Sequence, residues 1–301
     1  MGRKILATHI VEKFNEELKK SIQTMSFAPK LVGILANNDT AALTYSKWTQ
    51  NACERIGIKF DLVQCEKDDL ESQIVTLNNE KSVNGIMIYY PVFGNSHDNY
   101  LQSIISPLKD VEGLCQTFRF NMYNNIRFLD NEQKQKSLLP CTSLAIIKVL
   151  EHVQVYNSII PQGDRLHGKT ITVINRSEIV GRPLAALLAN DGAKVYSVDI
   201  NDIQLFSRGT GIKNKIHNVE ESNCTLQECL IDSDVVISGV PSKDYKVTTS
   251  QLKEGVVAIN FSTFQNFQPD ITEKSSLFVP SVGKVTVAML QRNLVRLASY
   301  Q

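Results

Sequence analysis

Short apolar runs alternate with segments of helical periodicity along the first half of the chain. Residues 31–36 form an apolar run that ends in the polar residues 37–39, which predicts a buried strand followed by a turn. Apolar positions recur with helical spacing from 41 to 56, and Gly57 is a typical helix stop. The next three elements are predicted as a strand, a helix and a strand, over 58–63, 70–77 and 83–90. This β-α-β-α-β order predicts a parallel sheet covered by helices.

A second alternating series follows a less regular stretch. Residues 107–137 are rich in Asn, Tyr, Phe and Arg with little periodicity, and residues 203–229 are polar and weakly patterned. We therefore expect mostly loops in both segments. The remaining helical patterns predict helices over 144–153, 179–189 and 286–298. The remaining apolar runs predict strands over 170–175, 194–200, 234–239, 256–261 and 277–279.

These patterns predict an α/β protein with two doubly wound domains, each with a parallel sheet, and a cleft between them. The most linker-like stretch is 157–168, which contains Asn, Pro, Asp and Gly residues. We therefore place the first domain at 1–150 and the second at 151–285, and expect the helix at 286–301 to pack back on the first. Ligands usually bind in clefts of this kind.

The composition argues against several classes of function. Lys and Arg total 32 and Asp and Glu total 31, so the net charge of +1 gives no support to nucleic acid or a membrane surface as a partner. The apolar runs are too short to cross a bilayer, and the N-terminus carries no targeting pattern, so we expect a cytosolic protein. The six Cys contain no Cys-x-x-Cys pair, which argues against a zinc ribbon. The five His are scattered, and we expect no metal site.

The strongest local motif is the segment 170–183, TITVINRSEIVGRP. It predicts a strand, a tight turn and a helix, the arrangement that presents helix N-terminal N–H groups to a dinucleotide diphosphate. Gly181 is its only glycine, so the glycine fingerprint is incomplete, and an ordinary strand–turn–helix is the alternative. Asp199 ends the next strand, roughly at the spacing (about 20 residues) where an acid binds the adenosine ribose of NAD. A solvated strand-end residue is the alternative for Asp199, and Arg176 could instead tolerate the 2′-phosphate of NADP.

Several segments, in order and over nearly the whole chain, resemble the methylenetetrahydrofolate dehydrogenase/cyclohydrolase family. They are Tyr45–Gly57, Lys109–Leu114, Pro140–Thr142, Arg176–Gly181 with Pro183, and Gly283–Leu290. Within the family, the chain is similar to the fungal cytosolic branch of NAD-dependent, monofunctional dehydrogenases. The resemblance implies hydride transfer from 5,10-methylenetetrahydrofolate to NAD in one-carbon and purine metabolism, by a homodimer. It also implies a folate-binding catalytic domain at 1–150 and a Rossmann-type NAD-binding domain at 151–285.

The chain departs from the family pattern at several positions. The lysine of the family's Tyr-x-x-x-Lys motif is Thr49 here. The other departures are Tyr89 for Gln, Glu112 for Asp, Asn175 for Gly, Ser143 for Pro and Ala145 for Gly. Removing hydride from the N–CH₂–N bridge moves no proton, whereas hydrolysing the methenyl product needs an activated water. We therefore expect a dehydrogenase without cyclohydrolase activity. A bifunctional enzyme that activates water by another group and a non-catalytic dinucleotide-binding protein are the alternatives.

Tyr45, Glu112 and Cys141 are the candidate catalytic residues. The resemblance implies that Glu112 accepts hydrogen bonds from the pterin ring; a surface loop acid is the alternative. Tyr45 is expected to line the folate site, or else to pack its helix. Cys141 lies at the start of a predicted helix, whose N-terminus favours the thiolate, but a small buried residue is an equal alternative. Thr49 and Tyr89 join Tyr45 and Glu112 as candidate substrate-binding residues that shape the pocket.

The candidate cofactor-binding residues lie at the carboxyl ends of the predicted strands in the second half. There they would contact the phosphates, the adenosine ribose and the nicotinamide of NAD. The placement beside the nicotinamide rests mainly on the family resemblance. In that order they are Arg176, Ser177 and Gly181, then Asp199 and Ile200, and then Phe261, Ser262 and Thr263.

Overall fold

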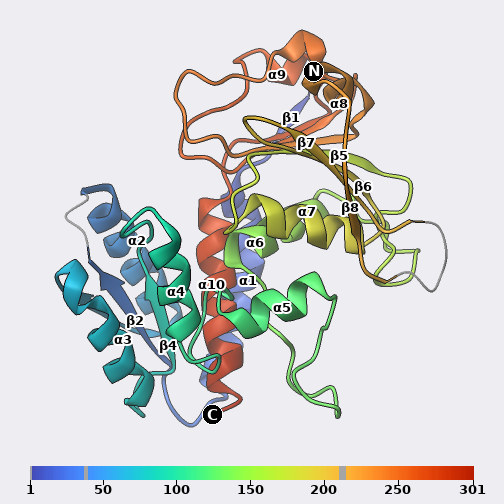
Figure 1. Ribbon diagram of the computed structural model, residues 1–301. Helices are drawn as coiled ribbons and strands as arrows, with labels where there is room; N and C mark the ends of the chain where they lie inside the picture. Colours follow the sequence, from blue (N-terminus) through green and yellow to red (C-terminus); the bar gives the residue numbers. More distant parts are fainter. Residues whose placement is uncertain (1, 37–39, 210–214) are drawn as a thin grey trace. The chain divides into compact units, whose positions relative to one another are not determined.

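The computed structural model describes residues 2–36, 40–209 and 215–301 (Figure 1). The turn predicted at 37–39 lies outside the described residues. The chain divides into two units, each made of several segments. Unit 1 comprises Met1–Val11, Met122–Ile126 and Thr142–Thr286, and unit 2 comprises Glu12–Asn121, Arg127–Cys141 and Val287–Gln301. One division falls within helix α6 (Cys141–His152), whereas the sequence pattern suggested a boundary after residue 150.

Unit 2 contains, among its described residues, a three-stranded parallel sheet. The strand order is β3 (Lys59–Gln64), β2 (Lys30–Leu35) and β4 (Gly85–Ile88), and Leu31 of β2 lies opposite Phe60 of β3. Five of the six residues of β2 are buried. Its nearly continuous apolar sequence is what a central strand needs, because both of its faces are covered. These strands confirm the prediction from the apolar runs.

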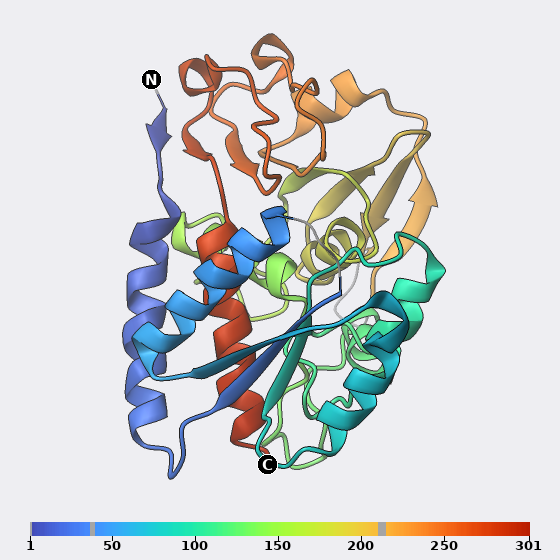
Figure 2. The same cartoon turned by 90° about the vertical axis from the view of Figure 1, so that its left-hand side faces the viewer.

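Alternate residues of β2 pack on opposite faces of this sheet. Leu31 and Leu35 join an apolar cluster with α2 (Thr40–Ile56) and the unit-2 residues of α10 (Gly283–Ala298). Residues 32 and 34 join a second cluster, which includes residues of the two helices α3 (Leu70–Asn79) and α4 (Ser96–Ile104). Figure 2 shows α3 and α4 in cyan and α10 in red, with the strands of this sheet between them.

Unit 1 contains, over the described ranges, an eight-stranded sheet in the order β1-β11-β10-β9-β5-β6-β7-β8. The chain runs from β5 to β6 on one side and later places β9 on the other side of β5. Such a reversal is where doubly wound sheets bind ligands, at the carboxyl ends of the strands. The strands from β1 to β6 in that order are parallel: β1 (Arg3–Lys4), β11 (Leu277–Val279), β10 (Val257–Asn260), β9 (Val235–Ser238), β5 (Thr170–Ile174) and β6 (Lys194–Val198).

The other edge of this sheet corrects one prediction. We expected mostly loops over 203–229, but this segment contains β7 (Ile203–Ser207), β8 (Asn218–Glu221) and the start of helix α8 (Leu226–Asp232). β7 pairs antiparallel with β6, and β8 pairs antiparallel with β7, so the sheet is mixed at this edge. All four residues of β8 are exposed, and an exposed edge strand carries no apolar pattern that a sequence could reveal.

The helices agree with the sequence in the regular segments and differ elsewhere. The predictions for α2, α3, α6, α10 and α7 (Gly181–Asn190) are confirmed. The loop expected over 107–137 is wrong in part, because it contains α5 (Gln116–Tyr123). Elements without a counterpart in the predictions include α4, α1 (Ala7–Gln23), α9 (Ile271–Lys274) and the short 3₁₀ helices η1 (Lys67–Asp69) and η2 (Thr249–Gln251). Within the described part of the chain, no helix is long and apolar enough to cross a membrane.

Candidate functional site

A buried carboxylate shapes the loop that carries Glu112 in unit 2. Asp110 is 1% exposed, and its side chain accepts hydrogen bonds from the backbone N–H groups of Glu112, Gly113 and Cys115 at 3.1, 2.9 and 2.7 Å. Gly113 has a φ of 72°, and a Cβ there would lie 2.7 Å from the carbonyl group of Leu139. The loop therefore requires glycine at position 113, and this conformation fixes the direction of the neighbouring Glu112 side chain.

Glu112 lies across the end of the edge strand β4. Its Oε2 accepts a hydrogen bond from the N–H of Ile88, the last residue of that strand, at 3.1 Å. Burial raises the pKa of this carboxyl to about 8, the Ile88 N–H opposes the shift, and the charge of Asp110 adds to it. Near neutral pH the group is therefore present in both protonation states, so it can accept or donate a hydrogen bond.

Tyr45 and Tyr89 bring two phenol rings together in the same unit. Their ring centroids are 6.2 Å apart with an edge-to-face angle of 83°, and Tyr45 also lies 5.8 Å from Trp48. Burial is the main cause of a raised pKa for both phenols. Both hydroxyls therefore stay protonated at neutral pH and serve as neutral hydrogen-bonding groups. Tyr45 is 36% exposed, so part of this residue is accessible to a ligand.

Thr49 occupies a closed position next to this pair. Its side chain is fully buried, and its Oγ1 donates to the Tyr45 carbonyl oxygen at 3.0 Å. A threonine hydroxyl cannot take up a proton near neutral pH, unlike a tuned lysine. Thr49 therefore offers no acid–base group for activating water.

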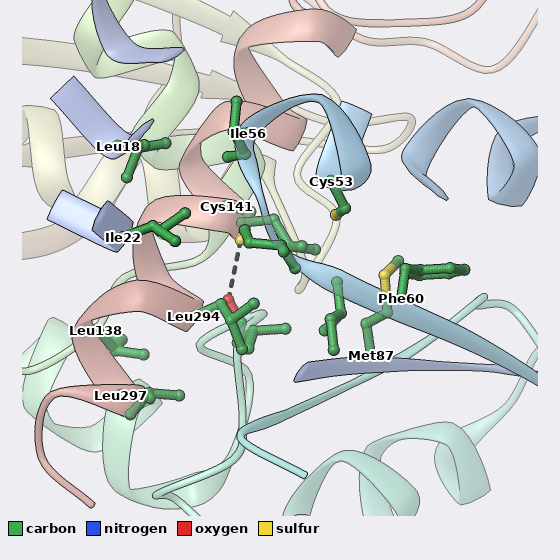
Figure 3. Close-up of a cluster of buried hydrophobic side chains, with 14 of the residues drawn as sticks. Leu18, Ile22, Cys53, Ile56, Phe60, Met87, Leu138, Cys141, Leu294 and Leu297 are labelled. Carbon is green, nitrogen blue, oxygen red and sulfur yellow. Dashed lines mark hydrogen bonds between the residues drawn. The ribbon is translucent and has the colours of Figure 1, made fainter. Parts of the chain in front are cut away.

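Cys141 begins helix α6, yet its thiol is kept neutral. Its Sγ donates to the carbonyl oxygen of Val111 at 3.2 Å and lies within the apolar cluster shown in Figure 3. Burial raises the thiol pKa well above its ordinary value of 9.0, and the charges of Glu112 and Asp110 raise it further. These effects outweigh the helix N-terminus that the sequence argument invoked, so the geometry favours the alternative of a small buried residue.

Asn293 was missed by the sequence analysis. It lies on α10, is fully buried, and its Nδ2 donates to the carbonyl oxygens of Val111 and Leu139 at 2.9 and 3.2 Å. The same nitrogen lies 3.5 Å from the sulfur of Cys141. Asn293 therefore ties the Glu112 loop and the start of α6 to the C-terminal helix. An asparagine in an amphipathic helix gives no sequence signal of such a role, since its partners come from distant segments.

In unit 1, the turn between β5 and α7 is held by Asn175. This residue has a φ of 90°, a left-handed conformation that favours glycine and tolerates asparagine. Its Nδ2 donates to the Gly239 carbonyl oxygen at 2.7 Å, and its Oδ1 accepts from the Ser177 N–H at 2.9 Å. The side chain thus links the turn to the end of β9, which explains how asparagine can stand where the family has glycine.

Gly181 begins α7 directly against this turn. Ser177 Oγ accepts from the Gly181 N–H at 3.4 Å, and the Ser177 carbonyl oxygen accepts from the Arg182 N–H at 3.0 Å. Every residue of α7 except Arg182 is buried, which accounts for its Ala- and Leu-rich sequence. Ser177 and Gly181 are therefore brought together at a helix N-terminus, the place that suits a diphosphate.

Arg176 points toward the end of β6. Its guanidinium donates to the hydroxyl and carbonyl oxygens of Ser197 and to the carboxylate of Asp202, and its side chain is 8% exposed. Asp199 and Ile200 lie on the turn between β6 and β7; Asp199 is exposed, and Ile200 is 95% exposed. The contact of Arg176 with cofactor phosphates stays a prediction.

The segment after β10 packs against the end of β9. A Cβ on Gly239 would lie 1.9 Å from the ring of Phe261, so glycine is required for this ring position. Ser262 Oγ donates to the Val240 carbonyl oxygen at 2.8 Å, and Asn260 Nδ2 donates to the Ser262 carbonyl oxygen at 3.0 Å. Phe261, Ser262 and Thr263 therefore follow a strand end in a braced loop. Gly239 and Asn260 are further supporting residues that the sequence analysis missed.

The cofactor and folate candidates thus lie in different units. Tyr45, Thr49, Tyr89, Glu112 and Cys141 lie in unit 2, and the eight cofactor candidates lie in unit 1. Over the residues described, no group of three or more His, Cys, Asp or Glu is placed to hold a metal ion.

Comparison with known proteins identifies the family. Residues 4–112 match the family model "Tetrahydrofolate dehydrogenase/cyclohydrolase, catalytic domain", and residues 140–301 match the NAD(P)-binding domain of the same family. The methylenetetrahydrofolate dehydrogenase [NAD(+)] of Schizosaccharomyces pombe is 55% identical over 298 residues, covering 99% of this chain and 93% of that protein. The solved structure of the NAD-dependent 5,10-methylenetetrahydrofolate dehydrogenase from Saccharomyces cerevisiae is 53% identical, with a TM-score of 0.94, covering 99% and 98% of the two chains.

A more distant match is the solved bifunctional enzyme FolD from Campylobacter jejuni. It is 25% identical with a TM-score of 0.77, and the match covers 99% of both chains. The order of folate-domain and NAD(P)-domain motifs, the doubly wound sheet of unit 1 and these whole-chain matches agree. The chain belongs to the tetrahydrofolate dehydrogenase/cyclohydrolase family.

Proposed function

We propose that the chain is a methylenetetrahydrofolate dehydrogenase that uses NAD to oxidise 5,10-methylenetetrahydrofolate to 5,10-methenyltetrahydrofolate. The observation that carries this proposal is the identity of 53–55% over nearly the whole chain to two fungal proteins named for that activity. A Dictyostelium discoideum protein of the same name is 47% identical over 299 residues. Asp199, exposed at the end of β6, supports the preference for NAD, because an acid there binds the ribose hydroxyls.

The residues of unit 1 fit a dinucleotide. Ser177 and Gly181 would hold the diphosphate at the start of α7, Asp199 and Ile200 would flank the ribose, and the loop 261–263 would lie beside the nicotinamide. The fit rests on the close approach of the turn to α7, which a side chain at Gly181 would block. When bound, NAD supplies the hydride acceptor.

The residues of unit 2 fit a folate whose reacting carbon becomes cationic. The C–H bond of the N–CH₂–N bridge breaks with its electron pair, and the two nitrogens share the positive charge that results. Glu112 would hold the donor edge of the pterin, and its ionised form would favour that charge. Tyr45, which is partly exposed, would orient the pterin ring. No proton is transferred in this step, so the neutral thiol of Cys141 and the neutral phenols are compatible with it.

Thr49, Tyr45 and Tyr89 support the absence of cyclohydrolase activity. Hydrolysis of the methenyl product needs a base that activates water. Thr49 stands at the lysine position of the family's motif, is fully buried, and already donates its hydroxyl proton to the Tyr45 carbonyl oxygen. The raised phenol pKa values of Tyr45 and Tyr89 leave neither as a base at neutral pH.

The setting in the cell is a further part of the proposal. We infer that the enzyme acts as a cytosolic homodimer in one-carbon and purine metabolism, as the family resemblance implies. Sedimentation of the purified protein tests the dimer, and fractionation of the source cells tests the location. A monomer across the working concentration range would contradict the first inference.

A direct assay tests the activity. Purified protein is given 5,10-methylenetetrahydrofolate with NAD or NADP, and reduced nucleotide is measured; hydrolysis of the methenyl form is followed separately. Turnover with NAD and slow methenyl hydrolysis are expected. No turnover with either nucleotide would overturn the enzyme assignment, and fast hydrolysis would show that another group replaces the missing lysine.

A further inference from the structure

We propose that Asp202 sets the preference for NAD over NADP by holding the guanidinium of Arg176, so that a 2′-phosphate meets an occupied arginine. This proposal rests on the proposed NAD-dependent function and names a positioning residue for it. Asp202 was not among the residues that the sequence singled out.

The geometry of Arg176 carries the argument. Its Nε donates to Ser197 Oγ at 3.0 Å, and its Nη2 donates to the carbonyl oxygens of Ser197 and Asp202 at 2.6 and 3.2 Å. Its Nη1 lies 2.8 and 2.9 Å from the two carboxylate oxygens of Asp202. A guanidinium has five N–H donors, and these five contacts engage all three of its nitrogens. The buried arginine is therefore saturated by its own chain.

The position of the Arg176–Asp202 pair matters as much as the engagement of the arginine's hydrogen-bond donors. Arg176 follows β5, and Asp202 ends the turn that follows β6, the neighbouring parallel strand. Asp199, the candidate ribose-binding acid, lies on the same turn, and its N–H donates to the Asp202 carbonyl oxygen at 3.0 Å. An arginine close to the ribose-binding acid is the residue that accommodates the 2′-phosphate in NADP enzymes. Arg176 stands in that neighbourhood but is already paired.

Charge adds to the effect. Asp199 lies on the same turn as Asp202, so Asp199, Asp202 and Arg176 together carry a formal charge of −1. A 2′-phosphate brings a further charge of about −1.5 to −2. The next arginine along the chain, Arg182, is also paired, with Glu178 at 3.2 Å. To bind the phosphate, Arg176 would have to leave Asp202 and expose that carboxylate to the same phosphate.

The test compares ligands that differ only in the 2′-phosphate. Adenosine 2′,5′-bisphosphate and 5′-AMP are titrated by calorimetry into the wild-type protein and into Asp202→Asn, which keeps the shape and removes the charge. We expect the bisphosphate to bind about tenfold or more tightly to Asp202→Asn, as one freed charge-assisted hydrogen bond allows, with 5′-AMP binding unchanged. The ratio of kcat/KM for NADP to that for NAD should rise in the same variant.

Two further variants separate specificity from structure. Asp202→Asn combined with Arg176→Met should lose the gain in bisphosphate binding, because the freed guanidinium is its source. Asp232→Asn is the matched control: Asp232 pairs with Lys194 at the start of β6, 3.1 Å away, outside the proposed site. It should leave both nucleotide affinities unchanged.

The outcomes are distinct. The proposal would be overturned if the gain in bisphosphate affinity persisted without Arg176, or if Asp232→Asn reproduced that gain. It would also be overturned if Asp202→Asn weakened the binding of both nucleotides equally, because Asp202 would then have a merely structural role. Unchanged binding of both nucleotides to Asp202→Asn would overturn it as well. Failure of the proposed function would show differently, as a wild-type protein that neither binds 5′-AMP nor turns over NAD.

Discussion

A Cβ placed on Gly181 would lie 1.7 Å from the carbonyl oxygen of Asn175. The turn after β5 and the first residue of α7 therefore approach each other at a distance that only glycine permits. We expect Gly181→Ala to displace the turn, to lower the free energy of unfolding by about 1–3 kcal/mol and to weaken NAD binding. Urea denaturation and titration with NAD measure the two effects.

The control for this variant is Gly283→Ala, at the first residue of α10. A Cβ there would meet only the Ser281 hydroxyl, at 3.9 Å, which is an ordinary contact. Its free energy of unfolding should stay within about 0.5 kcal/mol of wild type. A Gly181→Ala protein as stable as this control, with undiminished NAD affinity, would contradict the close approach.

Glu112 should make stability depend on pH. Its carboxyl has a pKa near 4.5 in an unconstrained chain and about 8 in the folded protein. Between these values the folded protein keeps a proton that the unfolded chain has released, so the free energy of unfolding falls as pH rises. One group gives a slope of at most about 1.4 kcal/mol per pH unit, reduced here because Glu112 is partly exposed.

Glu112→Gln isolates this contribution, because the amide resembles the protonated acid and cannot ionise. The variant should gain stability relative to wild type as pH rises from about 5 to about 8. Urea denaturation of both proteins at several pH values gives the comparison. Parallel stability profiles would show that the pKa of Glu112 is not raised.

The thiol of Cys141 should be unreactive at neutral pH. Burial and the nearby carboxylates hold its pKa well above the ordinary value, and only the thiolate is alkylated efficiently. Cys65 and Cys224 are partly exposed and should be labelled by iodoacetamide first, as peptide mass mapping over time will reveal. Labelling of Cys141 ahead of these two would show that its thiol is activated.

The same reasoning predicts a modest effect of Cys141→Ala. The variant loses the Sγ contact with Val111, which is worth about 1 kcal/mol of unfolding free energy. It should keep most of its dehydrogenase turnover, since hydride transfer needs no thiolate. A folded variant without turnover would assign Cys141 a chemical role.

Asn293 should be sensitive to a change that preserves its shape. In Asn293→Asp, an acceptor replaces the Nδ2 donor that faces the carbonyl oxygens of Val111 and Leu139. Loss of these buried bonds is expected to cost about 1–3 kcal/mol or more of unfolding free energy. Asn293→Leu, which removes both polar groups, should cost less than Asn293→Asp. The reverse order in thermal unfolding would contradict the donor role.

The sequence predicts elements best where burial sets the pattern. The strand at 30–35 is apolar on both faces because helices cover both, and its position is read correctly to within one residue. The strand at 218–221 is exposed at all four positions and takes its structure from pairing with β7. No local pattern announces such a strand, because the information lies in its neighbour.

The features of the candidate site also differ in how well the sequence predicts them. Motifs and resemblance select Tyr45, Glu112 and the β5–α7 turn, since these residues carry a chemical type at a fixed spacing. The direction of the Arg176 guanidinium depends on Asp202, a partner from another turn, and sequence reasoning left that question open. The neutral state of the Cys141 thiol depends first on its burial and then on carboxylates from a distant loop, whereas the local helix argument considered only the helix N-terminus.

Unit 2 is built from segments at the two ends of the chain, which has a consequence for its folding during synthesis. Its apolar cluster joins Leu31 of β2 to Leu290, Leu294 and Leu297 of α10. A ribosome adds about 5–20 residues per second, so this strand emerges many seconds before the helix that covers it. During that interval this apolar face of the sheet lacks the helix that buries it. Folding of the amino-terminal half therefore finishes only when the carboxyl-terminal helix has been synthesised.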